Sequence, residues 1–183
     1  MNLSDTLNKG LKPLVGLYPS LVGLLLGLLQ TGLFFQLTFT LSSTIGTFLL
    51  VTLCWLLGSA LGVLFLGKSR VPTTAFLFLA LAAYAVCVLM LNAAPFNTRW
   101  WPVYGLLIVL SGFYPGVFFA RMSGVYIART LFLRENNGFI VGLVLGSLLF
   151  MLLGRVALWV APGVIAALVY LVGEPEKLRT PEL

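Results

Sequence analysis

The stretch from residue 14 to residue 67 contains no lysine, arginine, aspartate or glutamate. A helix needs about 20 mainly apolar residues to cross the ~30 Å hydrocarbon core of a membrane, so this stretch is long enough for two crossings. The rest of the chain is similar: 60% of all residues are apolar, 9% are charged, and the mean hydropathy is +1.08. A water-soluble domain carries about 25% charged residues. The sequence therefore predicts an all-α polytopic membrane protein.

The uncharged stretch divides best at residues 38–44, where Thr and Ser side chains can end one helix and cap the next. The first two helices are predicted over residues 16–38 and 44–67. Polar segments and helix breakers predict four more, over residues 73–92, 100–120, 135–153 and 157–172. Pro162 and Gly163 are expected to interrupt the last of these. The expected fold is a bundle of about six transmembrane helices.

The distribution of basic residues predicts the orientation of this bundle. Membrane proteins keep Lys and Arg mainly in their cytoplasmic loops. With six crossings, all but two of the eleven basic residues fall on the side of the chain termini, and the exceptions are Arg99 and Arg155. Both termini are therefore predicted to be cytoplasmic. The formal charge of +6 then indicates contact with anionic lipid headgroups, and not with nucleic acid.

The chain divides into three parts. Residues 1–13 carry leucines four residues apart, a spacing typical of a short helix lying on the cytoplasmic membrane surface. Residues 14–173 form the six-helix domain, and residues 174–183 are a polar cytoplasmic tail. A second surface helix is predicted over residues 122–133, before the fifth crossing begins at Glu135.

The sequence offers few candidate residues for enzymatic chemistry. The absence of histidine excludes His-ligated haem, His-ligated chlorophyll and imidazole catalysis. Cys54 and Cys87 fall inside predicted helices, as buried apolar residues do. All five acidic residues are expected at helix ends or in cytoplasmic segments, which provides no carboxylate pair for a metal or for hydrolysis. We expect a non-enzymatic protein with no metal and no cofactor, although lipid and quinone remain open as ligands.

Uncharged polar residues are the remaining candidates for a ligand site. Five of them lie in or beside predicted helices: Gln30, Gln36, Tyr114, Asn136 and Asn137. Such side chains usually join helices by hydrogen bonds inside a membrane, and they can also contact a ligand. Glu135 is expected in a first helical turn, where a carboxylate interacts favourably with the helix dipole, with a functional polar site at the cytoplasmic end of the bundle as the alternative.

Glycines recur at a spacing of four residues on four of the predicted helices. The glycines of this pattern are Gly23, Gly27, Gly58, Gly62, Gly112, Gly116, Gly138, Gly142 and Gly146. Residues four apart share one face of a helix, and glycine there lets a second backbone approach closely. The pattern predicts close helix packing inside the bundle, with an interface between subunits as the alternative.

Three stretches carry a resemblance to a known family. They are residues 24–62, above all SSTIGTFLLVTLCWLLGSALG at 42–62, then SGFYPGVFFAR at 111–121 and TLFLRENNGFIVGLVLGSLLFMLLG at 130–154. In these the chain resembles the membrane-embedded domains of bacterial spermidine-synthase-like proteins, which are similar to one half of a major-facilitator transporter. The resemblance implies a six-helix unit in the inner membrane of a bacterium.

The chain also departs from that family. Members usually have an acidic residue in the first helix, where this chain has Gln30 and Gln36, and an aspartate at the start of the fifth, where it has Asn136 and Asn137. Members often continue into a soluble aminopropyltransferase domain, whereas only about ten residues follow the sixth helix here.

The leading interpretation is a non-enzymatic accessory or assembly subunit that packs against other membrane proteins. One alternative is a carrier or channel for a polyamine or another organic cation, formed when two copies of the six-helix unit pair. Another is a module that binds a lipid, a quinone or a pigment. The expected partners are membrane lipids together with other subunits or a second copy of the chain.

Overall fold

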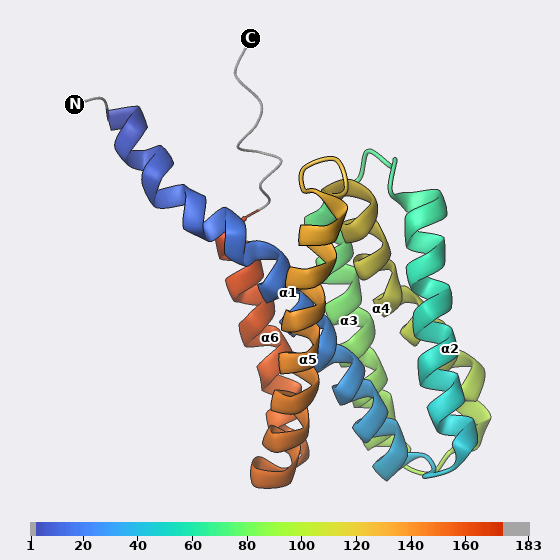
Figure 1. Ribbon diagram of the computed structural model, residues 1–183. Helices are drawn as coiled ribbons and strands as arrows, with labels where there is room; N and C mark the ends of the chain where they lie inside the picture. Colours follow the sequence, from blue (N-terminus) through green and yellow to red (C-terminus); the bar gives the residue numbers. More distant parts are fainter. Residues whose placement is uncertain (1–2, 174–183) are drawn as a thin grey trace.

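The computed structural model describes the backbone of residues 3–173 and the side chains of residues 16–173. Over that range the chain forms helices and no strand (Figure 1). The main helices are α1 (Leu3–Thr40), α2 (Ile45–Leu61), α3 (Thr73–Ala93), α4 (Trp101–Met122), α5 (Ala128–Leu153) and α6 (Arg155–Val172). A π-helical segment, η1 (Gly62–Leu66), extends α2, and a short 3₁₀ segment, η2 (Thr98–Trp100), precedes α4. Six of the described helical segments are long and apolar enough to cross a membrane.

Two predicted surface helices do not exist as separate elements. α1 continues without a break from Leu3 to Thr40, so the backbone of the predicted N-terminal surface helix belongs to the first long helix. α5 begins at Ala128, which contradicts a surface helix over residues 122–133 and a fifth helix starting at Glu135. Arginine side chains are long enough to reach the membrane surface from within a helix, so they do not fix where a helix begins. The side chains of residues 1–15 and the predicted tail, 174–183, lie outside the described residues.

Successive helices run in opposite directions, and α1 and α4 are the most buried of the six (Figure 1). α1 packs most extensively against α5 and then α6, while α4 packs most extensively against α2 and then α3. The two halves of the chain, α1–α3 and α4–α6, therefore make equivalent contacts. The pair α1–α5 corresponds to α4–α2, and the pair α1–α6 corresponds to α4–α3. Because each half has an odd number of helices, α4 runs in the direction opposite to α1, and the two halves are inverted relative to each other. Many transporters contain inverted repeats of this kind.

Glycines bring together the backbones of two parallel helix pairs. We call these contacts the α1–α5 seam (Gly23, Gly27, Gly138, Gly142) and the α2–α4 seam (Gly58, Gly62, Gly112, Gly116). A Cβ atom built on Gly142 would lie 3.0 Å from the Cα of Gly27, and one built on Gly62 would lie 3.0 Å from the Cα of Gly116. Real Cβ atoms rarely come so close, so any larger residue would push the helices apart. Gly146 differs, since it faces the side chain of Thr31 and not a backbone.

α6 continues through Pro162, so the prediction of an interrupted sixth helix was wrong. Proline has no N–H and leaves the carbonyl four residues earlier, that of Leu158, without its helical donor. The hydroxyl of Tyr84 on α3 donates a buried hydrogen bond to this carbonyl at 2.7 Å. Gly32 on α1 leaves room for the ring, because a Cβ there would lie 3.0 Å from ring carbons of Tyr84. A hydrogen bond between helices thus replaces the missing backbone bond.

A single arginine ties α4 to the connection between α2 and α3. The Arg121 guanidinium donates to the carbonyls of Gly67, Ser69 and Val71 at 3.2, 2.9 and 2.7 Å. It also donates to the hydroxyls of Ser69 and Thr73 at 3.2 and 3.0 Å. The loop therefore wraps around one cation, which holds the end of the α2–α4 seam in place.

Candidate functional site

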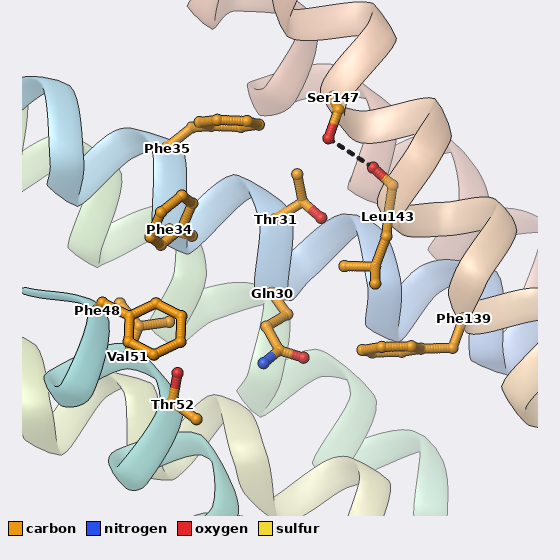
Figure 2. Close-up of a pocket in the computed structure, with 10 residues that line it drawn as sticks. All are labelled: Gln30, Thr31, Phe34, Phe35, Phe48, Val51, Thr52, Phe139, Leu143 and Ser147. Atoms are coloured by element: carbon orange, nitrogen blue, oxygen red, sulfur yellow. Dashed lines mark hydrogen bonds between the residues drawn. The ribbon is translucent and has the colours of Figure 1, made fainter.

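A groove of about 370 Å³ opens on the side of the bundle between α2 and α5, with α1 at its base (Figure 2). The seams explain its position, because α5 is drawn close to α1 while α2 is drawn close to α4. No such seam joins α1 to α2, where Phe34 and Phe48 meet edge to face with ring centroids 6.1 Å apart. The residues that line the groove are Gln30, Thr31, Phe34, Phe35, Phe48, Val51, Thr52, Phe139, Leu143 and Ser147.

Four of these lining residues are polar, and three of them, Gln30, Thr31 and Thr52, form no side-chain hydrogen bond within residues 16–173. The Ser147 hydroxyl donates to the carbonyl of Leu143 at 2.8 Å, within its own helix. The Thr31 hydroxyl is buried and has no hydrogen-bond partner among the described residues. Gln30 is partly exposed, and its side chain extends from α1 into the space that α2 and α5 border (Figure 2). The groove thus offers an amide and a hydroxyl to a ligand.

Aromatic rings form most of the apolar wall of the groove. Phe34, Phe35, Phe48 and Phe139 line it, and Phe35 also stacks on Phe150 with centroids 4.6 Å apart and planes 10° apart. The faces of aromatic rings attract cations as well as apolar groups. No titratable side chain belongs to the lining, so the groove itself is suited to binding and not to acid–base chemistry.

Of the five ligand residues predicted from the sequence, the structure brings only Gln30 to the groove. Tyr114 is 1% exposed and lies inside the bundle on α4. Asn136 and Asn137 lie on the exposed side of α5. The five residues therefore do not form one site.

Gln36 belongs to a separate polar contact at the end of the bundle where α5 meets α6. Its side chain is completely buried, and its Oε1 accepts from Nε of Arg155 at 3.1 Å while its Nε2 donates to the Arg155 carbonyl at 3.3 Å. Arg155 also donates to Oδ1 of Asn92 at 3.0 Å. These bonds join α1, α3 and α6, which makes Gln36 a packing residue.

Sequence reasoning assigned Glu135 to the first turn of the fifth helix and did not include it among the ligand residues. Because α5 begins at Ala128, Glu135 lies about two turns inside the helix. Its residue is 8% exposed, and its backbone carbonyl is in contact range of a Cβ built on Gly23 of α1. An ionisable residue within a membrane span is a candidate functional residue by default. Its i+4 spacing to Phe139 would have linked it to the groove, had the start of the helix been known.

Within residues 16–173 no three His, Cys, Asp or Glu side chains come close enough to hold a metal ion. Cys54 and Cys87 are free thiols on different helices. A scan against protein-family models, a search of curated proteins and a search of solved structures each found no match to this chain.

Proposed function

We propose that the chain is an integral membrane protein of the bacterial inner membrane with both termini in the cytoplasm. Its six apolar helices support this, and so does the distribution of charge along them. The α2–α3 connection carries Lys68 and Arg70, and the last turn of α4 carries Arg121; both lie at the same end of the bundle as the start of α1 (Figure 1). An excess of basic residues at one end is typical of the cytoplasmic side.

The function that the geometry supports best is a non-enzymatic carrier for small organic cations that have an apolar, aromatic body. The observation that carries this proposal is the groove, which combines four phenylalanines with an amide and a hydroxyl that lack partners among the described residues. Phenylalanine faces attract cations, and the polar groups can orient them. A ligand of this kind would enter from the side, between α2 and α5.

The inverted arrangement of the two three-helix halves also supports a carrier. Transporters of this architecture bind substrate at the interface between repeats and expose it alternately to the two sides. A single six-helix unit leaves the groove open toward lipid, so a second copy facing it would complete the pathway. The resemblance to one half of a major-facilitator transporter is consistent with such a pair.

Uptake of benzyltrimethylammonium, a permanently charged aromatic cation, into proteoliposomes tests the proposal. Ser147→Phe fills the groove and is expected to lower uptake to the level of protein-free liposomes. Leu148→Phe is the matched control, because Leu148 is 48% exposed on the outer side of the same helix and that variant should transport like the wild type. Absence of saturable uptake by the wild-type protein would refute the carrier proposal.

The second candidate is an accessory subunit of a larger membrane assembly. It is favoured by the large apolar faces that α2, α5 and α6 leave uncovered, for example at Leu56, Val144 and Leu171. Purification in mild detergent separates the two functions. A stoichiometric complex with another membrane protein, together with no uptake, would favour the accessory role, whereas a homodimer would favour the carrier.

A further inference from the structure

Glu135 is the one acidic residue of the chain between residues 16 and 173, and it is buried. A charged carboxylate in the apolar part of a membrane is costly unless a cation, a proton or several hydrogen bonds neutralise it. A glutamate side chain is shorter than an arginine side chain, so it reaches less far along the helix towards water. The residue therefore needs a partner at the place where the helix holds it.

The cations nearest to Glu135 along the chain and at that end of the bundle are already engaged. Arg134 is exposed, and its Nη1 donates to the carbonyl of Gly16 at 2.9 Å. Arg121 donates four hydrogen bonds to the α2–α3 loop and a fifth to Thr73 at the start of α3. No side chain within residues 16–173 forms a hydrogen bond or an ion pair with the Glu135 carboxylate. The partner of this group is therefore missing from the described bundle.

Glu135 continues the row of α5 residues that lines the groove. Phe139, Leu143 and Ser147 follow it at intervals of four, and residues at this spacing form one ridge along a helix. One such step is about 6 Å along the helix axis. The α1–α5 seam runs beside this row of residues, since a Cβ built on Gly23 would meet the carbonyl of Glu135 and one built on Gly27 would meet that of Phe139. The groove has one end nearer the start of α5, and Glu135 lies about one helical turn beyond that end.

We infer that Glu135 is the countercharge for the ligand: the cationic head of an organic ammonium ion pairs with its carboxylate while the aromatic body lies among the phenylalanines of the groove. The separation of about one helical turn between Glu135 and Phe139 matches a small molecule with its charge at one end. This inference rests on the proposed function, because it gives the groove its ligand class. It assigns to Glu135 a binding role and no covalent step.

The test compares a cation with its uncharged isostere. Benzyltrimethylammonium and neopentylbenzene have the same shape, and only the first is charged. Their dissociation constants are measured in lipid nanodiscs by tryptophan fluorescence, to which Trp55 contributes one turn along α2 from Val51 and Thr52 of the groove. Glu135→Gln keeps the size of the side chain and removes its charge. Glu182→Gln removes the same charge from the C-terminal segment and is the control.

The wild-type protein is expected to bind the cation at least about tenfold more tightly than the isostere, because a carboxylate attracts a quaternary ammonium ion by charge and does not attract its neutral isostere. Glu135→Gln should lower this preference about tenfold, to what the phenylalanine faces alone provide, and leave binding of the isostere within about twofold, while Glu182→Gln changes neither constant. An equal loss for both ligands, or an unchanged preference for the cation, would overturn the role of Glu135. If both ligands bind the wild type equally and Ser147→Phe abolishes that binding, the groove is a binding site and only the charge assignment fails. If neither ligand binds, the proposed function itself fails and the inference fails with it.

Discussion

Replacing Gly142 with alanine is expected to destabilise the bundle, because the α1–α5 seam has no room for one more carbon. A Cβ at this position would lie 3.0 Å from the Cα of Gly27, 3.1 Å from the carbonyl carbon of Leu24, and closer still to the Leu24 oxygen. These are backbone atoms, so no side-chain rotation can relieve the overlap, and the helices must separate by about 1 Å. Such a gap removes a quarter to a half of the dispersion energy of each atom pair.

The expected size of the loss follows from that geometry. Each contacting pair of heavy atoms contributes about 0.1–0.2 kcal/mol, and a helix seam holds tens of such pairs, so the separation costs about 2–3 kcal/mol. Alanine returns up to about 1 kcal/mol through its higher helix propensity. The net loss is then about 1–2 kcal/mol, within the range typical of overpacked cores.

The free energy of unfolding of both proteins can be measured by SDS titration in mixed micelles, with tryptophan fluorescence as the readout. Gly163→Ala is the matched control: Gly163 is also in a helix, α6, but a Cβ there would have no atom within 4 Å. That variant should be unchanged or more stable by up to about 1 kcal/mol. If Gly142→Ala proved as stable as Gly163→Ala, α1 and α5 would not approach as closely as described, and the account of the seam would be wrong.

Two further predictions concern single polar side chains. Arg121→Gln removes the guanidinium that the carbonyls of the α2–α3 loop contact, so trypsin in detergent should cleave faster at the two basic residues of this loop. Arg129→Gln changes an exposed arginine and should leave the cleavage rate as it is. Tyr84→Phe should lower the free energy of unfolding by about 0.6–2 kcal/mol in the wild type. The loss should be clearly smaller in a Pro162→Ala background, because alanine at position 162 provides a backbone N–H for the Leu158 carbonyl that Tyr84 otherwise contacts. Equal losses in both backgrounds would show that the hydroxyl does not act on the carbonyl that Pro162 leaves free.

The number of helices and the limits of the middle ones could be predicted from the sequence because they depend on local properties. The span predicted over residues 73–92 corresponds to α3 (Thr73–Ala93), and the one over 44–67 corresponds to α2 with η1. Hydropathy, polar connections and prolines determine such limits within a few residues. The glycine spacing likewise indicates faces suited to close packing, but four such faces are chemically alike, so the spacing cannot say that α1 pairs with α5 and α2 with α4.

Partners that lie far apart in the sequence could not be predicted. The interruption expected at Pro162 fails because Tyr84 supplies the missing hydrogen bond, and the two residues are on different helices. Gln36 was a candidate for ligand binding, yet Arg155 takes both of its polar atoms. In both cases the local sequence indicates that a polar group needs a hydrogen-bond partner. Only the packing of α1, α3 and α6 shows which residue that partner is.

The error at the start of α5 has the largest consequence for function. Sequence reasoning began this helix at the charged pair of Arg134 and Glu135 because charge usually marks the membrane boundary. The two side chains behave differently, however: a guanidinium on a long stem can reach the surface from inside a span, whereas a glutamate remains where its helix holds it. Arg134 reaches out to the Gly16 carbonyl, and Glu135 stays buried between α5 and α1. The same extension of α5 that made this prediction wrong therefore puts a carboxylate one turn from an aromatic groove, and the cation selectivity proposed above rests on that position.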